Sequence, residues 1–254
     1  MLKTPCHIVS DLHIGVASAA TERLFESYLA AITGRIPSLI INGDLFDFWF
    51  EWKTVIPRRG FRTLAALAAL RESGTEIVYV AGNHDCWGGA VLRNDVGVEY
   101  DVGPWEGLIG DWRVRVEHGD GLRRTEDRKY RMVRPIMRSP AAIRLFRALH
   151  PDWATRLAVG SSGASRTYAA KDGGAGLQSI GHTYLAGNPE LDVLVYGHSH
   201  VAALERVGKA QVFANAGSWL DAPTYIEITD QSIALLKWTG SAERASLYEI
   251  DRGA

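Results

Sequence analysis

Five short motifs rich in Asp, Asn and His constrain this chain more than any other feature, because each follows a short apolar run. The motifs are Asp11-Leu12-His13, Gly43-Asp44, Gly82-Asn83-His84-Asp85, His118-Gly119-Asp120 and Gly197-His198-Ser199-His200. The runs before them contain three or four residues, many of them β-branched. Such runs, bounded by Gly and polar residues, are typical of buried strands. Because open α/β sheets place their sites at the carboxyl ends of strands, we expect the five motifs to meet.

The side chains of these motifs are those that bind divalent metal ions. Carboxylate, amide and imidazole donors suit hard to borderline ions such as Mn, Fe, Zn or Mg. The donors are too many for one ion, whereas two ions about 3.5–4 Å apart would use them all and share one carboxylate. Asp44 is the predicted bridge. No Cys is among the donors, which argues against a structural zinc site. A single such motif is usually a turn or a satisfied surface pair, but five in this order favour a metal centre.

Length and composition indicate a soluble, globular protein. The chain of 254 residues is long enough for one large domain, and its 46% hydrophobic and 22% charged residues are ordinary for that class. No apolar run approaches the length that spans a bilayer. The first strand is expected close to Met1, so we expect no signal peptide. Cys6 and Cys86 make no disulfide framework, which favours a reducing cytoplasm.

Apolar periodicity predicts the main elements around these motifs. Residues 21–33 and 63–72 have helical spacing, and a glycine follows the end of each. Four strand-like segments close the chain, and their alternation predicts a second, more antiparallel sheet. The segments are 211–214, 224–228, 233–238 and 246–250.

An aromatic segment follows Asp44, and two interpretations of it stay open. The side chains of Phe46, Phe48, Trp49, Phe50 and Trp52 either pack in the core or form an apolar wall near the site. The two can coexist, because clefts for apolar ligands are lined by such residues.

The motifs resemble those of the calcineurin-like metallophosphoesterases. The matching patterns are Asp-x-His, Gly-Asp, Gly-Asn-His-Asp and Gly-His-x-His. This resemblance implies an α/β fold, an αββα sandwich of two mixed β-sheets flanked by helices. Residues 44–50, 118–122 and 149–152 further resemble the UDP-2,3-diacylglucosamine pyrophosphatases of lipid A biosynthesis, and this likeness extends to about Trp219.

The resemblance also implies which residues bind each ion. One ion would be bound by Asp11, His13, Asp44 and His200. The other would be bound by Asp44, Asn83, His118 and His198. Mn is the first choice for both ions, with Fe, Zn and Mg left open.

His84 is the predicted catalytic side chain beside the ions. It can donate a hydrogen bond or a proton to a phosphate oxygen, and Asp85 is expected to orient it. In the lipid A enzymes this position tends to be Arg, so His84 follows the wider superfamily. The alternative interpretation is that His84 is a turn residue whose ring is hydrogen-bonded within the protein and has no part in catalysis.

The stretch after the fourth motif is strongly basic. Residues 122–147 carry nine basic and two acidic side chains. Ser139 and Pro140 predict the start of a helix that ends before Pro151. We expect residues 122–185 to form a helical lid inserted within a single domain of residues 1–254. The basic stretch is either a solvated face or a lid that attracts an anionic substrate and contacts the inner-membrane surface. Its charge would also attract nucleic acid, which we consider the less favoured partner.

Substrate contacts follow only from the resemblance. The lipid A enzymes use an Asp-x-x-Tyr in this region, which Asp127 and Tyr130 match. Arg166 lies in a stretch that loosely resembles another substrate-binding part, and Asn83 is also expected to contact substrate.

The resemblance therefore predicts an enzyme of lipid A biosynthesis. The reaction is hydrolysis of the anionic nucleotide-lipid UDP-2,3-diacylglucosamine to UMP and 2,3-diacylglucosamine 1-phosphate by metal-activated water. Two alternatives stay open: a phosphoesterase acting on a nucleotide, phosphoprotein or nucleic acid, and a metal-dependent binding module without activity. We expect a cytoplasmic protein that associates peripherally with the inner membrane and has no obligate protein partner.

Overall fold

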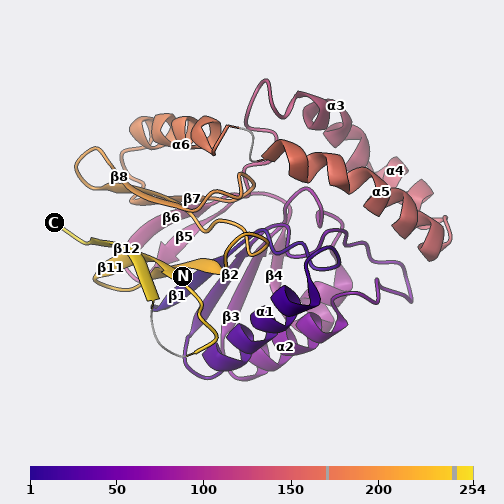
Figure 1. The fold of residues 1–254 in the computed structure, drawn as a ribbon, viewed down its shortest axis with the longest axis horizontal. Helices are drawn as coiled ribbons and strands as arrows, with labels where there is room; N and C mark the ends of the chain where they lie inside the picture. Colours follow the sequence, from indigo (N-terminus) through magenta and orange to yellow (C-terminus); the bar gives the residue numbers. More distant parts are fainter. Residues whose placement is uncertain (170–171, 242–244, 254) are drawn as a thin grey trace.

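Two β-sheets packed face to face form the centre of the molecule, with helices on both outer faces (Figure 1). This computed structural model describes residues 1–169, 172–241 and 245–253, and for residues 161–169 the backbone alone is described. The seven-stranded sheet has the order β12 (Ala245–Asp251), β11 (Ser232–Lys237), β10 (Thr224–Ile228), β1 (Cys6–Val9), β2 (Ser38–Asn42), β3 (Glu76–Val80) and β4 (Glu99–Asp101). The five-stranded sheet has the order β5 (Trp105–Ile109), β6 (Trp112–Val116), β7 (Val193–Tyr196), β9 (Gln211–Asn215) and β8 (Ala203–Val207).

Each sheet combines parallel and antiparallel pairs. Strands β1 to β4 are parallel, and β10 to β12 continue the sheet from β1 in antiparallel pairs. In the second sheet β6, β7 and β9 are parallel, and the edge strands β5 and β8 are antiparallel to their neighbours. Every residue of β1, β2 and β7 is buried, as expected for strands covered on both faces. The predicted αββα sandwich of two mixed sheets is confirmed.

The grouping of the last four strands differs from the prediction. We expected them to form one antiparallel sheet, but β9 pairs with β7 in the second sheet and β10 to β12 extend the first. Cys6 pairs with Ile228, and the side chains of Ile226 and Ile228 enter the core between the sheets. Alternation identified these strands, but it carries no information about which distant strand each one pairs with.

Three apolar cores fill the three interfaces between the four layers. The first lies between the seven-stranded sheet and helices α1 (Ala19–Ile32) and α2 (Phe61–Glu72). The second lies between the two sheets, and the third lies between the five-stranded sheet and α6 (Ala175–Gly187). Figure 1 shows α1 and α2 on one side of the sandwich and α6 on the other. A fully buried Leu or Ile in such a core contributes roughly 1.5–3 kcal/mol to stability.

The two outer helices of the first sheet lie close to where the sequence predicts them. Helix α1 begins two residues earlier than expected because Ser18 caps it, its Oγ accepting a hydrogen bond of 3.1 Å from the Thr21 amide. Its buried face consists of Phe25, Tyr28, Leu29 and Ile32. Helix α2 also begins two residues early, at Phe61. A short π-helix, η1 (Val91–Val96), precedes β4.

The predicted insert contains helices with two different positions. Helix α6 packs Leu177 and Leu185 onto the second sheet and so belongs to the layered fold. Helices α3 (Arg128–Met137), α4 (Pro140–Arg147) and α5 (Pro151–Ala169) lie beside the end of the sandwich instead (Figure 1). The predicted start of α4 is confirmed, because Ser139 Oγ accepts a hydrogen bond of 3.1 Å from the Ala142 amide. Neither α3 nor α4 has a fully buried residue.

Candidate metal centre

The five motifs come from two different sheets and meet at one end of the sandwich. Strands β1, β2 and β3 of the first sheet lead into the first three motifs, and β6 and β7 of the second sheet lead into the last two. Parallel strands align their carboxyl ends, so each sheet brings its motifs to one edge. The two edges face each other, and the side chains they carry form one cluster.

The backbone at this cluster is strained. Within the described ranges five residues other than glycine have a positive φ, between 48° and 62°, and all five are predicted ligands. They are Asp11, His13, Asp44, His198 and His200. A left-handed backbone costs an ordinary residue roughly 1–2 kcal/mol. Such strain persists only where the surroundings fix it, and it concentrates at functional sites.

Two glycines allow the motifs to approach closely. A Cβ on Gly43 would lie 2.4 Å from His118 Nδ1, and a Cβ on Gly82 would lie 2.2 Å from Asp44 Oδ1. No ordinary Cβ contact is that short. The glycines are therefore required by the distance between loops, and Gly43 also adopts a positive φ of 77°.

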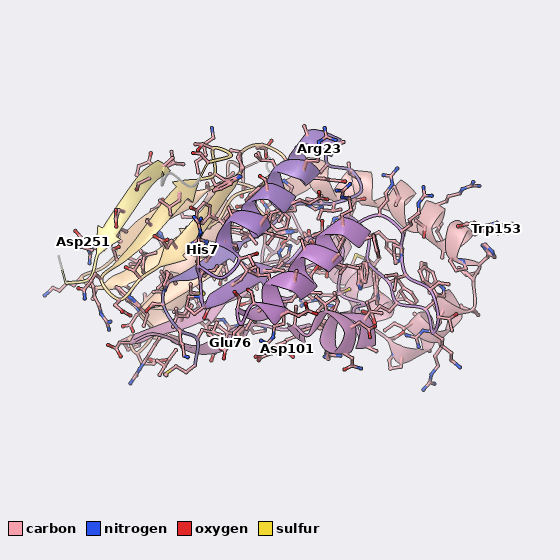
Figure 2. All side chains as sticks on the ribbon, turned by 90° about the horizontal axis from the view of Figure 1, so that it is seen from below. His7, Arg23, Glu76, Asp101, Trp153 and Asp251 are labelled. Carbon is pink, nitrogen blue, oxygen red and sulfur yellow. The ribbon has the colours of Figure 1, made fainter. Side chains whose placement is uncertain are left out.

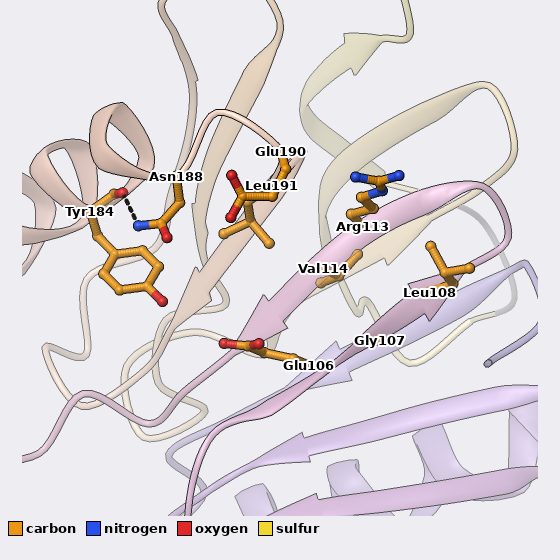
Figure 3. Close-up of a pocket in the computed structure, with 9 residues that line it drawn as sticks. All are labelled: Glu106, Gly107, Leu108, Arg113, Val114, Tyr184, Asn188, Glu190 and Leu191. Atoms are coloured by element: carbon orange, nitrogen blue, oxygen red, sulfur yellow. Dashed lines mark hydrogen bonds between the residues drawn. The ribbon is translucent and has the colours of Figure 1, made fainter.

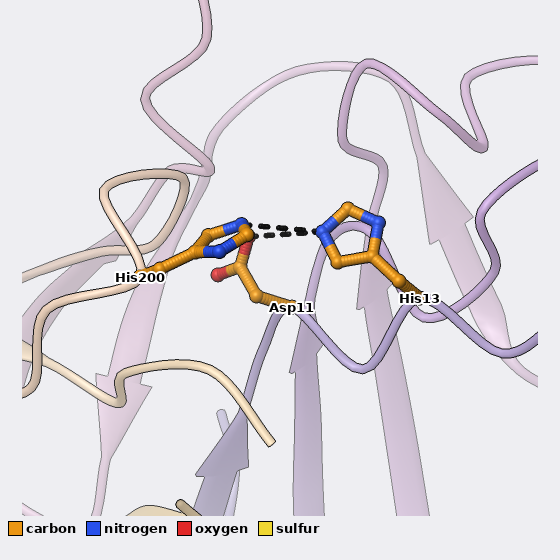
Figure 4. Close-up of side chains that lie close together, drawn as sticks. All are labelled: Asp11, His13 and His200. Atoms are coloured by element: carbon orange, nitrogen blue, oxygen red, sulfur yellow. Dashed lines mark hydrogen bonds and ion pairs between the residues drawn. The ribbon is translucent and has the colours of Figure 1, made fainter. Parts of the chain in front are cut away.

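The carboxylate of Asp11 is held by one oxygen only. Its Oδ2 accepts hydrogen bonds from the His198 amide at 3.1 Å and from Ser10 Oγ at 2.6 Å. Its Oδ1 is buried without a hydrogen-bond donor and lies 3.4 Å from His200 Nε2. Figure 4 shows this carboxylate beside the imidazoles of His200 and His13, whose Nε2 atoms lie 3.2 Å apart.

Asp44 repeats this arrangement at the centre of the cluster. Its Oδ1 accepts a hydrogen bond of 2.9 Å from the His84 amide. Its Oδ2 lies 3.3 Å from His118 Nε2 and 3.8 Å from His13 Nε2. One oxygen of each aspartate thus fixes a loop, while the other faces the imidazole nitrogens.

The imidazole of His118 is oriented in the same way. Its Nδ1 donates a hydrogen bond of 2.9 Å to the Asn42 carbonyl, which places the proton on Nδ1. Its Nε2 is buried and has no hydrogen-bond partner. A backbone carbonyl that fixes the tautomer from behind is typical of metal-ligating histidines.

These donors fit divalent cations. Buried polar atoms rarely remain without a partner, so Asp11 Oδ1 and His118 Nε2 need an explanation. Among the described residues, three groups have donor atoms within 4.8 Å of one another: Asp11 with His13 and His200, His13 with Asp44 and His84, and Asp44 with His118 and His198. His13 and Asp44 each belong to two of these groups, and Asp44 is the carboxylate that does so, as expected of a shared carboxylate ligand. Asn83 is buried on the loop that carries His84.

The charges of the cluster support each other. Burial favours a higher pKa for Asp11, but the neighbouring imidazoles of His200 and His118 lower that pKa to about 2. Burial disfavours a charged His118, yet the carboxylate of Asp44 raises the His118 pKa well above its usual value. Burial lowers the pKa of His13 to about 4. The carboxylates are therefore ionised near neutral pH.

His84 faces the same cluster from the third motif. Its Nδ1 donates a hydrogen bond of 2.8 Å to the Asp47 carbonyl, and its Nε2 lies 4.0 Å from Asp44 Oδ2. Asp47 also lies behind His13, with Oδ1 3.7 Å from His13 Nδ1. Sequence reasoning assigned Asp47 no role, although its position three residues after the predicted bridge was a signal.

The hydrogen bonds of Asp85, the residue expected to orient His84, come from backbone amides and a tyrosine hydroxyl. Asp85 Oδ1 accepts from the Gly82 amide at 2.8 Å, and Oδ2 accepts from the Leu45 amide at 2.8 Å and from Tyr79 Oη at 2.5 Å. Burial, followed by the charge of Asp44, raises the Asp85 pKa to about 6. Asp85 thus holds the loops of the second and third motifs together, because it accepts hydrogen bonds from both.

Two of the residues expected to contact substrate, Asp127 and Tyr130, lie at the start of α3. Asp127 Oδ1 is 3.5 Å from His198 Nε2 and 2.9 Å from Arg123 Nη2. Burial, together with the nearby charge of Asp120, raises the pKa of the Tyr130 hydroxyl above its usual value. The side chain of Arg166 lies outside the described residues.

Some side chains of the aromatic segment pack in the core, and others contact helix α4. Phe46 and Trp49 belong to the core under α1 and α2. Phe50, with its neighbours Phe48 and Trp52, contacts Phe146 of α4 instead, at a ring-centroid distance of 4.9 Å for Phe50.

A buried carboxylate that sequence reasoning missed holds this segment. Glu51 accepts hydrogen bonds from the amides of Gly89, Val91 and Leu92 at 2.8, 3.0 and 3.3 Å. The segment is thereby tied to the chain that follows the third motif.

One cavity lies away from the motifs. It has a volume of about 430 Å³ and is lined by residues of β5, β6 and the end of α6, among them Glu106, Arg113 and Asn188 (Figure 3). Arg113 lies near the start of β6, whereas His118 follows the end of that strand. No predicted site residue lines this cavity.

Comparison with known proteins agrees with the geometry. Residues 4–202 match the family of calcineurin-like phosphoesterases. The chain belongs to this family. Members have a phosphoesterase activity that depends on divalent metal ions, so this calcineurin-like protein is a metal-dependent phosphoesterase.

Relatives of known name cover most of the chain. A UDP-2,3-diacylglucosamine hydrolase of Porphyromonas gingivalis is 29% identical, over 88% of this chain and 94% of the relative. A protein of the same name from Proteus mirabilis is 27% identical, over 91% and 97%. Among solved structures, a dimetal phosphatase from Danio rerio is 9% identical with a TM-score of 0.47, over 98% of this chain and 99% of that one.

Proposed function

We propose that this phosphoesterase cleaves the diphosphate of UDP-2,3-diacylglucosamine, giving UMP and 2,3-diacylglucosamine 1-phosphate. The observation that carries the proposal is the convergence of the five motifs on one buried cluster in a chain whose relatives bear this hydrolase name over most of their length. The ligands would be divided as the motifs suggest. Asp11, His13 and His200 would hold one ion, His118, His198 and Asn83 would hold the other, and Asp44 would hold both.

The bound ions would polarise the phosphoryl group and supply an activated water, with Mn as the first choice. The residues of the chain place and assist these groups. The carbonyl of Asp47 fixes the Nδ1 proton of His84, so that Nε2 is the atom facing the cluster. From there the imidazolium form of His84, which carries a proton on Nε2 as well, would donate a hydrogen bond or that proton to a phosphate oxygen as negative charge builds on it.

The helices beside the sandwich have the character of a surface for an anionic lipid. Large apolar side chains are exposed along them, including Met132, Ile136, Leu145 and Trp153, of which Leu145 and Trp153 are each 73% exposed. Figure 2 shows Trp153 at the opposite end of the molecule from Asp251. Most basic residues of the same helices are exposed as well. Each basic residue near an anionic membrane contributes about 1 kcal/mol of attraction.

This surface would bring the enzyme to its substrate at the cytoplasmic face of the inner membrane. Across the described ranges, no helix has the length and apolar character needed to cross a bilayer. Contact would therefore be peripheral, through α3 to α5. The aromatic cluster of Phe48, Phe50, Trp52 and Phe146 would offer an apolar wall for an acyl chain.

Release of UMP from UDP-2,3-diacylglucosamine in detergent micelles with Mn tests the proposal, measured beside a chromogenic phosphodiester. We expect UMP release in the wild type and its loss in the Asp44→Ala variant. Turnover of the chromogenic ester without UMP release would reject the lipid substrate and leave another phosphoester, such as a nucleotide, as the target.

A further inference from the structure

The basic stretch contains one arginine that is not part of the surface. Arg123 is 2% exposed and is among the largest fully buried side chains, whereas its neighbour Arg124 is exposed. Burying a guanidinium is costly unless it is paired and hydrogen-bonded. The partners of Arg123 therefore indicate which part of the structure this buried side chain holds in place.

Arg123 joins the two ends of the segment that carries α3, α4 and α5. Its Nη2 donates to Asp127 Oδ1 at 2.9 Å, and Asp127 is the residue directly before α3. Its Nη1 lies 3.5 Å from Asp172 Oδ1, and Asp172 is where the described chain resumes after α5. One side chain thus bridges the points at which the chain leaves the sandwich and returns to it.

The return point is fixed to the sandwich. Asp172 accepts hydrogen bonds from the amides of Gly174 and Gly176 at 3.0 and 2.9 Å, which anchors it to the first turn of α6. A Cβ on Gly176 would lie 2.6 Å from Asp172 Oδ2 and 3.2 Å from Arg123 Cδ. The first turn of α6 therefore has room for the stem of Arg123 only because a glycine is there.

The exit point is fixed to the metal centre. Asp127 Oδ2 accepts from the amides of Gly121 and Arg123, both at 3.1 Å, and these residues directly follow the fourth motif. Asp127 Oδ1 lies 3.5 Å from His198 Nε2.

We propose that Arg123 is a positioning residue that clamps the neck of the α3–α5 segment between Asp127 and Asp172 and thereby sets the place of Asp127 and of these helices over the metal centre. The expected effect on turnover of the lipid rests on the proposed function. The clamp itself does not, because it consists of contacts within the chain. Arg123 touches none of the predicted reacting atoms, so its loss should affect large substrates that reach α3–α5 and leave small ones alone.

The Arg123→Met variant tests the clamp, with Arg124→Met as the matched control that removes the same charge one residue away. We expect Arg123→Met to lower kcat/KM for UMP release at least tenfold, chiefly through KM, and to keep hydrolysis of a chromogenic phosphodiester and the Mn content within twofold of the wild type. Arg124→Met should leave all three within twofold. Equal losses on both substrates, or no loss on either, would overturn the proposal.

Hydrogen exchange supplies a readout that needs no lipid substrate. The Mn-loaded Arg123→Met protein should exchange the amides of Gly121, Arg123 and the first turns of α3 and α6 at least tenfold faster than the wild type, while β1 and β2 keep their protection. If the wild type releases no UMP, the proposed function fails and this measurement still decides the clamp. Unchanged exchange at the neck would overturn it.

Two further variants distinguish loss of the clamp from loss of the fold. Arg123→Lys keeps the charge but loses the fork that reaches two carboxylates. Arg123→Met combined with Asp172→Asn removes the charge left unpaired. If the clamp acts through Asp172, the double variant should exchange at the neck no faster than Arg123→Met alone. Additive increases from the two substitutions would reject Asp172 as the second anchor.

Discussion

At the scale of single residues, the site depends on groups that fix one atom of a side chain and leave another facing the cluster. His84 has this arrangement, with Nδ1 on the Asp47 carbonyl and Nε2 near Asp44. In His84→Asn the amide nitrogen can still donate to Asp47, but nothing replaces Nε2. We expect kcat for a phosphodiester to fall roughly 100- to 10,000-fold, the range for loss of a general acid. The Mn content, measured by elemental analysis of the same sample, should not change.

A His84→Asn protein with turnover near that of the wild type would remove His84 from catalysis. One that loses its Mn instead would make His84 a ligand, as its membership of a donor group with His13 and Asp44 allows.

His118 predicts a link between metal binding and protons. Burial alone would lower the His118 pKa. In the metal-free protein Asp44 instead raises this pKa well above its usual value, so the imidazole carries a second proton and a positive charge at pH 7. A metal binds neutral imidazole, so binding should release this proton, and Mn affinity should rise with pH below that pKa. Asp11 and Asp44 have lowered pKa values and contribute no proton in this range.

Calorimetry of Mn binding at pH 7 in two buffers of different ionisation enthalpy measures this release directly. We expect a positive number of protons released per chain and a smaller number in His118→Asn. An apparent enthalpy that does not depend on the buffer would contradict the linkage.

Single site residues could be predicted where the residues that identify them are neighbours in the sequence. A short apolar run followed by an acid or His indicates a ligand loop without knowledge of its partners, and the structure brings those residues together. The same reasoning did not identify Asp47, Glu51 or Arg123. Their roles depend on contacts with His84, the η1 amides and Asp172, which only the folded chain defines.

At the scale of elements, the ring of Phe146 joins helix α4 to the aromatic segment. Phe146 stacks on Trp87 at an interplanar angle of 12° and contacts Phe50. Aromatic pairs contribute about 0.5–1.5 kcal/mol each beyond area burial. We expect Phe146→Ala to cost roughly 2–3 kcal/mol of local docking energy, so that the amides of α4 exchange about 30- to 150-fold faster while the sheets remain protected.

Leu145→Ala is the matched control, because Leu145 lies next to Phe146 and is 73% exposed. Hydrogen exchange over residues 140–147 separates the two variants. Equal exchange rates in both would show that the ring does not hold the helix.

Element boundaries were more predictable than element partners. The cap at Ser139 placed the start of α4 correctly because a cap and its helix adjoin in sequence. The strands at the end of the chain were also found, but β10 pairs with β1 across more than 200 residues. Strand partners depend on the whole set of buried faces, so alternation alone assigned β10 to β12 to the wrong sheet.

At the scale of the whole molecule, the sandwich explains why the ligands come from both halves of the chain. Each sheet aligns its own motifs, and the core between the sheets sets the distance between the two edges. Asp44 from the first sheet and His118 from the second are brought to 3.3 Å by that packing. The centre therefore depends on both sheets, and its donors are spread over the stretch from Asp11 to His200.

The central claim is that these motifs form one hydrolytic centre for two ions that share Asp44. Its most direct test measures Mn bound per chain together with phosphodiester turnover, in the wild type and in Asp44→Asn. Asp101→Asn, an exposed acid on edge strand β4, is the control. We predict two ions and turnover in the wild type and the control, and at most one ion with at least a 100-fold loss of turnover in Asp44→Asn. A wild type that binds a single ion, or an Asp44→Asn protein that keeps two ions and its activity, would contradict the account.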